Sequence, residues 1–110
     1  MPTIYKVLGQ SAPAGITNTN LYTVPAATSA VISTLVIANR DPSVSTYRIA
    51  IRPAGATIAN QHYIAYDVNV GASDSTTLTL GITLAATDII TVYASTSKLS
   101  FSVFGSEITA

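Results

Sequence analysis

The chain has 110 residues, of which 48% are hydrophobic and only 9% are charged, and its five basic residues balance five acidic ones. Ordinary globular domains carry about 25% charged residues, and disordered chains combine low hydrophobicity with high net charge. The composition therefore excludes a disordered chain. The absence of cysteine excludes a disulfide framework and a thiolate metal site. We expect one domain over residues 1–110.

The first twenty residues leave two interpretations open. Thr3–Leu8 can form a short strand, and Gly9–Asn20 is rich in the Gly, Ser, Asn and Pro residues of loops and arms. Residues 1–20 are thus either an extension that packs on a neighbour or an edge strand of their own domain. No basic region with an apolar run marks a signal peptide here. No apolar stretch in the sequence approaches the ~20 residues of a membrane span, so we expect neither secretion nor a membrane partner.

The stretch from Leu21 to Asn39 is predicted to organise the fold. Leu21–Val24 alternates, and Pro25 cannot donate to a sheet ladder, which indicates a corner or an edge position. Ser29–Ala38 is dominated by β-branched residues and predicts a long core strand. A strand of this length needs a partner on each side and a second layer to cover it.

The remaining chain alternates between strand patterns and turn signals. After the Asn39–Ser43 turn, the alternation over Val44–Arg52 places Tyr47, Ile49 and Ile51 on one face. Further strands are predicted over 62–70, 76–80, 89–94 and 99–104, with 81–87 as a connection, Gly105 at a bulge and 107–109 as a tail. In the first of these, one face is expected to hold Ile64, Tyr66, Val68 and Val70, and the other Tyr63, Ala65, Asp67 and Asn69.

No segment shows a sustained helical period. Seven or eight short strands with turn signals every ~8–12 residues predict an all-β fold, an antiparallel β-sandwich that is jelly-roll-like. The sequence leaves the strand order open.

Catalytic and metal-binding patterns are weak. His62 is the single histidine, and on one continuous strand Asp67 would lie on the opposite face from it. No Gly-x-Ser-x-Gly elbow occurs. Asp41, Asp74 and Asp88 lie at turns, where Asp is favoured for backbone reasons. We therefore expect no enzyme, no cofactor and no metal.

Two further groups of residues could bind a partner. Arg48 and Arg52 share a strand face, and Arg40 precedes the turn before it; they form a basic patch or, as we favour, pair with Asp67, Asp41 or Glu107. A net charge of zero argues against nucleic acid. The six tyrosines could stack on sugars, although core or interface packing is the favoured interpretation.

Several runs resemble small virion proteins of tailed bacteriophages, including phages of cyanobacteria and marine bacteria. The runs are KVLGQ at 6–10, LYTVPA at 21–26, STLVIANR at 33–40, RIAIRPAG at 48–55, HYIAYD at 62–67, LTLG at 78–81, TVYA at 91–94 and FSVFGSE at 101–107. They are strand and turn motifs and cover nearly the whole chain. The resemblance implies a non-enzymatic β-sandwich, present in many copies on the capsid or tail of the virion.

From the resemblance and the uncharged composition we expect a capsid decoration or cement subunit. It would form homo-oligomers, with a trimer as one form, and bind the major capsid protein. The alternatives are a tail, baseplate or fibre component that binds tail proteins, as an adaptor or as a glycan- or receptor-binding module. The candidate interface residues are Tyr5, Lys6, Arg40, Arg48, Arg52 and Tyr63.

Overall fold

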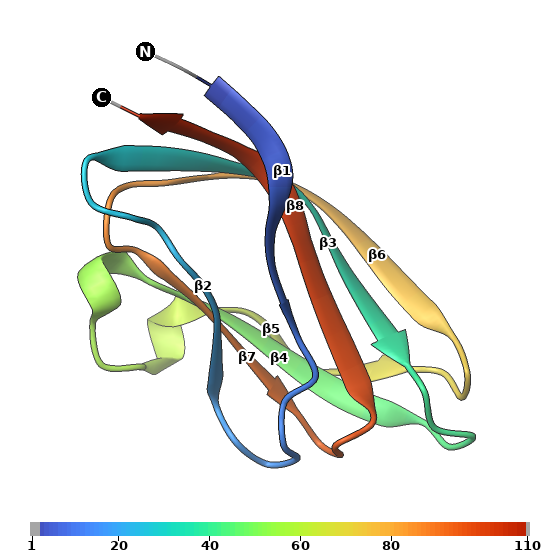
Figure 1. The fold of residues 1–110 in the computed structure, drawn as a ribbon. Coiled ribbons are helices and arrows are strands. Elements are labelled where there is room, and N and C mark those ends of the chain that lie inside the picture. Colours follow the sequence, from blue (N-terminus) through green and yellow to red (C-terminus); the bar gives the residue numbers. More distant parts are fainter. Residues whose placement is uncertain (1–2, 110) are drawn as a thin grey trace.

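A computed structural model describes residues 3–109, which form eight strands and two short 3₁₀ turns (Figure 1). The strands are β1 Thr3–Ser11, β2 Thr19–Thr23, β3 Thr28–Asn39, β4 Ser45–Arg52, β5 Tyr63–Val70, β6 Ser75–Leu84, β7 Ile89–Ala94 and β8 Leu99–Thr109. The 3₁₀ turns, η1 Pro53–Gly55 and η2 Asn60–His62, lie in the connection between β4 and β5.

The strands make two four-stranded antiparallel sheets that pack face to face. Sheet A has the order β1-β8-β3-β6 and sheet B the order β2-β7-β4-β5. The first strand thus pairs with the eighth, the second with the seventh, the third with the sixth and the fourth with the fifth. This nested pairing is that of a jelly roll. The predicted all-β antiparallel sandwich is confirmed, with eight strands.

Residues at the start of the chain form an edge strand. β1 pairs with β8 along its length, from Thr3 opposite Ile108 to Ser11 opposite Phe101, so the two ends of the chain lie together in Figure 1. Of the two possibilities for residues 1–20, the structure has the edge strand over Thr3–Ser11. Pro25 lies, as predicted, in the corner where the chain passes from β2 in sheet B to β3 in sheet A.

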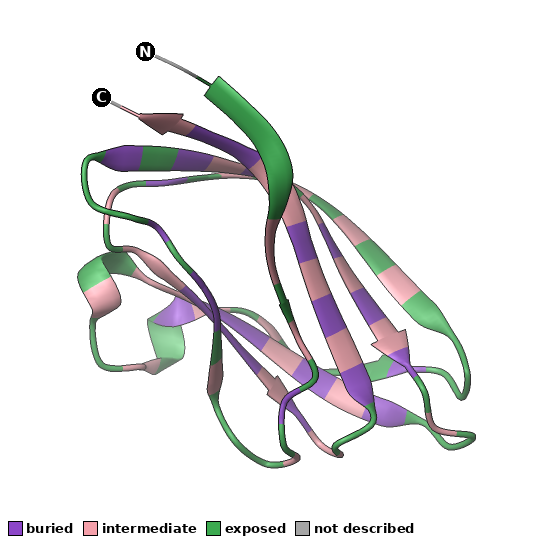
Figure 2. Cartoon of the chain, viewed as in Figure 1, coloured by how far each residue is buried: buried purple, intermediate pink, exposed green. Residues whose placement is uncertain are grey.

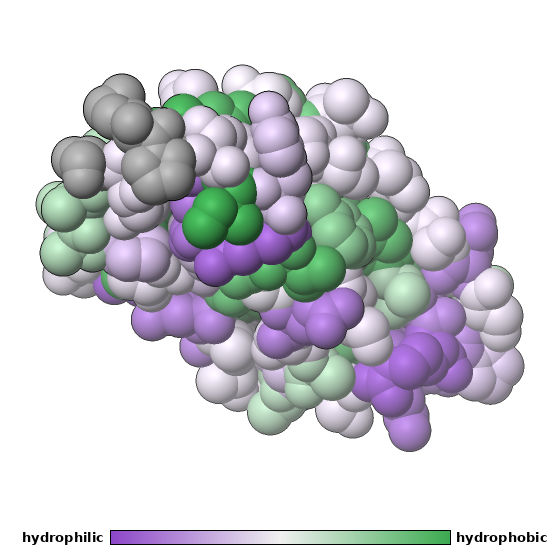
Figure 3. Space-filling view, turned by 45° about the horizontal axis from the view of Figure 1, so that its top comes forward, coloured by the Kyte–Doolittle hydropathy of each residue, from purple (hydrophilic) through white to green (hydrophobic). Residues whose placement is uncertain are grey.

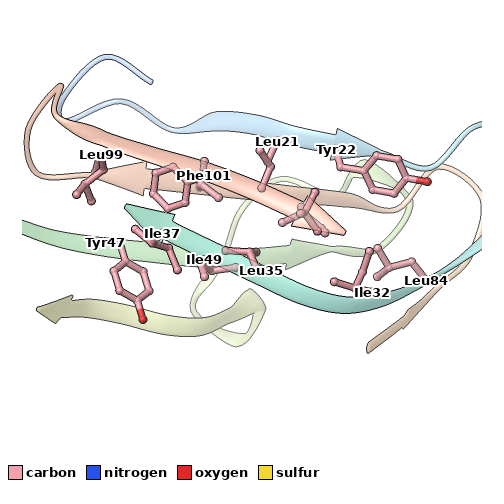
Figure 4. Close-up of a cluster of buried hydrophobic side chains, with 14 of the residues drawn as sticks. Leu21, Tyr22, Ile32, Leu35, Ile37, Tyr47, Ile49, Leu84, Leu99 and Phe101 are labelled. Atoms are coloured by element: carbon pink, nitrogen blue, oxygen red, sulfur yellow. The ribbon is translucent and has the colours of Figure 1, made fainter. Parts of the chain in front are cut away.

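The core lies between the sheets and is built by strand alternation. Along β3, buried side chains alternate with less buried ones on either side of the pairing shift between Ile32 and Thr34, and the same alternation runs from Ser45 to Ile49 in β4; Figure 2 shows this banding. Figure 4 shows how the inward side chains of both sheets meet in one layer. The largest fully buried residues include Tyr47, Phe101, Ile32, Leu35, Ile37 and Ile49. Burial raises the pKa of the Tyr47 phenol, because the charged form would lose its hydration.

Two predicted strand ends were wrong. β6 does not end at Leu80 but passes through Gly81, whose φ is +65°, and continues to Leu84, which lies opposite Ala30. β8 likewise continues to Thr109, so 107–109 is not a tail. In both strands the pairing shifts next to a glycine, and the strand continues beyond it: beyond Gly81 in β6, and in β8 beyond Gly105, where the sequence predicts a bulge.

The predicted faces of β5 were also wrong. The pairing of β4 with β5 shifts twice, with Ile49 opposite Ala65 and Ala50 opposite Tyr63. Asp67 has a φ of +52° within this irregular strand. Each extra residue of a bulge reverses the facing of the residues beyond it. Tyr63 and Tyr66, which simple alternation would separate, therefore lie side by side with their rings in edge contact.

Gly105 allows β8 and β3 to approach closely at a bulge. A Cβ atom built on Gly105 would lie 2.0 Å from the Val31 carbonyl oxygen, which is far inside van der Waals contact. The shift in pairing between Ile32 and Thr34 occurs at the same level of the sheet. This position therefore excludes any side chain.

We predict that Gly105→Ala lowers the free energy of unfolding by about 1–3 kcal/mol or more, because the strands must separate to admit the methyl group. Urea denaturation followed by circular dichroism measures this difference. Gly71→Ala is the matched control, since its Cβ would meet Asp74 at an ordinary 3.6 Å. Equal stability of the two variants would contradict the close approach.

Candidate interaction surfaces

A buried polar cluster joins the two sheets at the end where the chain termini lie. Tyr22, on β2 of sheet B, donates a 2.5 Å hydrogen bond from its hydroxyl to Glu107 Oε2 on β8 of sheet A. Lys6 on β1 forms an ion pair of 2.9 Å with the other carboxylate oxygen. Glu107 and Tyr22 are 8% and 7% exposed, so this carboxylate is buried but has a partner for each oxygen.

The cluster shifts the titration of both buried groups. The hydrogen bond from Tyr22, followed by that from Lys6, holds the pKa of Glu107 below its ordinary value of 4.5, even though burial acts in the opposite direction. Burial, reinforced by the bond to the carboxylate, raises the pKa of the Tyr22 phenol. The negative carboxylate and the neutral phenol are therefore the stable forms in the folded protein.

Beside this cluster, the first half of β1 exposes apolar side chains at the edge of sheet A. Ile4, Tyr5 and Val7 are 51%, 83% and 49% exposed, and Figure 2 shows the whole of this segment as exposed. A hollow of about 430 Å³ next to it is lined by Tyr5, Lys6, Val31, Ser33, Phe104, Gly105 and Ser106. In the space-filling view of this end of the molecule, hydrophobic side chains gather in the middle of the surface (Figure 3).

The outer face of sheet A carries no charged side chain among the residues that the strand pairing places on it. Leu35, Leu78 and Val103 pair across the inner face, so their neighbours point outward. The resulting outer rows consist of Gln10, Ser102, Val36 and Thr77, then Ser100, Ala38 and Ser75, and then Val7, Phe104, Thr34 and Thr79. We call these residues the uncharged face.

The outer face of sheet B has a different chemistry. The Arg48 guanidinium lies between two tyrosine rings, 4.1 Å from the centroid of Tyr66 and 4.3 Å from that of Tyr93. Its Nε also donates to Asp67 Oδ1 at 2.6 Å, and this bond raises the pKa of the guanidinium. The ring of Tyr63 meets that of Tyr66 edge-on, with centroids 4.9 Å apart. We call Arg48, Tyr63, Tyr66 and Tyr93 the tyrosine row.

Arg52 lies further along the same face of β4 and has neutral partners. It donates to the carbonyl oxygens of Gly55 and Ala56 and to Asn20 Oδ1 and Thr91 Oγ1, at distances of 2.7–3.2 Å. Within residues 3–109, no carboxylate lies within 4.0 Å of it. It borders a hollow of about 300 Å³, the polar hollow, lined by Asn18, Asn20, Arg52, Thr57, Ile58 and Thr91.

The sequence-predicted residues thus fall at three separate places. Tyr5 and Lys6 border the hollow beside β1, whereas Arg48, Arg52 and Tyr63 share the outer face of sheet B. Arg40 lies apart from both groups and donates to the Ser97 carbonyl oxygen at 2.9 Å. The favoured pairing of arginine with aspartate is confirmed for Arg48 and Asp67, but Arg40 and Arg52 bond to neutral groups.

His62 has a local backbone partner in η2. Its ring is buried, and Nδ1 accepts a hydrogen bond from the Ala59 amide at 3.1 Å, while Asp67 is engaged by Arg48. The pattern did not identify Thr91 or Asn20 as members of a surface, and it named Tyr93 only as one of six tyrosines that could stack on sugars. The alternation of Ile90, Val92 and Ala94 as inward residues could have placed Thr91 and Tyr93 outward, but no signal in the sequence joins Asn20 to them.

Within the described part of the chain, residues 3–109, no group of three or more metal-ligating side chains gathers. No helix over the same residues could cross a membrane. Neither family models nor curated proteins give a match to this sequence.

We predict that Glu107→Gln flattens the acid side of the stability profile. Because the pKa of Glu107 is lowered on folding, its contribution is complete above the ordinary carboxyl range and is lost as the pH falls through the lowered value. The wild type should therefore lose more stability than Glu107→Gln between about pH 6 and pH 3. Thermal denaturation at a series of pH values measures this, and parallel profiles for the two proteins would contradict it.

We predict that Tyr22→Phe costs about 1.5–3 kcal/mol, since it leaves a buried carboxylate oxygen without its donor. Lys6→Gln should cost less than about 1 kcal/mol, because the lysine is half exposed and water screens its ion pair. Chemical denaturation at pH 7 compares the two. A larger effect for Lys6→Gln would show that the ion pair, and not the phenol, stabilises this end.

Proposed function

We propose that this chain is a non-enzymatic structural subunit of a phage virion, and specifically a capsid decoration or cement subunit that binds the outside of the shell. The observation that carries the proposal is the uncharged face of sheet A, bordered by the exposed apolar edge strand β1. A surface made mostly of Ser, Thr, Ala and Val side chains loses little hydration energy on contact with a partner, because no charge must be stripped of water.

The size of this surface suits a stable contact. Four strands about 4.8 Å apart and roughly 34 Å long span about 650 Å², and β1 adds its exposed edge. A standard protein interface takes about 800 Å² from each partner. Edge strands with apolar side chains and unpaired backbone groups are normally covered in the working state of a protein. Attachment to a shell protein through the uncharged face and the outward side chains of β1, with a second copy of the chain on the free edge of β1, would provide this cover.

Self-association is the second part of the proposal. β5, the edge strand of sheet B, also exposes aliphatic side chains: Ile64 is 48% and Val68 38% exposed. β1 and β5 are edges of different sheets, so a contact between them in two copies would be head-to-tail and would close into a ring at a suitable angle. A trimer is one such ring, in agreement with the oligomer expected for a decoration subunit.

A position in the tail, baseplate or fibre is the alternative that copy number separates. A decoration subunit should be present in numbers similar to those of the major capsid protein, and a tail component in far fewer. Quantitative mass spectrometry of purified particles gives this ratio. A low ratio would reject decoration and favour the tail.

We predict that Thr77→Lys, an exposed change on the uncharged face, abolishes binding to shells stripped of the protein. The lysine would have to be desolvated without a partner. Co-sedimentation with the shells measures binding, and Thr23→Lys, an exposed position on β2 of sheet B, is the matched control. If both variants bind like the wild type, sheet A is not the attachment face.

We also predict that attachment depends weakly on salt, with less than a few-fold change in affinity between about 0.1 and 1 M NaCl. Salt screens interactions between charged groups, and the uncharged face contributes no charged group to the proposed contact. Release of the protein at moderate salt would show that ion pairs hold it.

A further inference from the structure

The outer face of sheet B is the second surface with a distinct chemistry, and its arginines are held rigidly. Arg48 is fixed by two rings and by Asp67. Arg52 is fixed by four hydrogen bonds to Asn20, Gly55, Ala56 and Thr91. A guanidinium has five N–H donors, so one donor of Arg52, on Nη2, is left for another acceptor.

The two arginines differ in charge balance. The carboxylate of Asp67 compensates Arg48, whereas the four groups to which Arg52 donates are neutral. The polar hollow beside Arg52 therefore carries a positive charge together with the amides of Asn18 and Asn20 and the hydroxyl of Thr57. A fixed guanidinium with spare donor capacity, surrounded by amides and hydroxyls, suits a carboxylate attached to a hydroxyl-rich molecule.

The tyrosine row lies next to the polar hollow on the same face. Thr91 and Tyr93 are two residues apart on β7, which places them about 7 Å apart along the strand. Tyr66 is 56% exposed, and its ring is supported by Arg48 and Tyr63. Rigid tyrosines present an apolar ring and a hydroxyl together, which suits the apolar face and the hydroxyl groups of a sugar ring.

We propose that this face binds an acidic saccharide, with a sugar carboxylate at Arg52 in the polar hollow and a neighbouring sugar ring on the tyrosine row. The hollow of about 300 Å³ accommodates one sugar unit of a longer chain. A nucleic acid fits less well, because a strand-binding groove needs several uncompensated basic residues and this face offers Arg52 alone, with Asp67 beside the tyrosines. This inference does not rest on attachment through sheet A.

The experiment titrates the full chain with sialyllactose, with a linear oligogalacturonate and with neutral lactose, followed by NMR chemical shifts. We expect saturable binding of at least one acidic saccharide, at least about tenfold tighter than that of lactose, which is the range of one charge-assisted hydrogen bond. Arg52→Gln should weaken acidic binding by about tenfold or more and leave lactose unchanged. Tyr66→Ala should weaken binding of both classes.

Arg40→Gln is the matched control, since it removes the same charge from a residue whose side chain donates to the Ser97 carbonyl, away from the polar hollow. If Arg52→Gln fails to fold, as judged by circular dichroism, Arg52→Lys is used instead. This variant keeps the charge but lacks the paired N–H donors of the guanidinium, and it should still weaken binding of the acidic saccharide. The proposal is overturned if no acidic saccharide saturates, or if Arg40→Gln weakens binding as much as the Arg52 variants. Equal or tighter binding of an acidic peptide or of a single-stranded oligonucleotide would also overturn it.

Discussion

Burial of apolar side chains between the two sheets is the interaction on which the rest of the structure depends. Charged residues are scarce, so stability must come from buried area, at roughly 25 cal/mol per Å² of apolar surface. Hydrogen bonds between buried polar groups join the two sheets at each end of the sandwich. The hydroxyl of Tyr22 reaches Glu107 at one end of β3, and the amide of Asn39 donates to the Val70 carbonyl at the other. These buried bonds set the register of one sheet on the other.

The same packing decides what each outer face displays. Because the inner positions of sheet A take Leu35, Leu78 and Val103, the outer ones hold uncharged side chains, most of them small. In sheet B the inward Tyr47 and Ile49 leave Arg48 and Arg52 outside. One domain thus offers an uncharged face suited to a lasting contact and, on the other side of its core, a rigid face of tyrosine and arginine suited to a ligand.

Sequence alone was sufficient wherever strand alternation is unbroken. The inward side of β4 and the corner at Pro25 follow from local patterns, whereas the patterns left the partner of Arg48 open among three carboxylates. Prediction failed at bulges, because one extra residue reverses the facing of all that follow. The bulge at Asp67 places the ring of Tyr66 against Arg48, which alternation does not predict. The pairing shift near Gly81 broke the alternation, so the sequence did not indicate that β6 continues to Leu84. The link between Tyr22 and Glu107 spans 85 positions, and only the jelly-roll pairing brings these residues together.

The central claim is that sheet A faces the particle and sheet B faces outward. A cryo-EM map of the intact virion, at a resolution that separates strands, tests it most directly. The account predicts density for this chain on the capsid exterior, with β1, β8, β3 and β6 against the shell and the tyrosine row exposed to solvent. A map with β2, β7, β4 and β5 against the shell, or with this chain absent from the capsid, would contradict it.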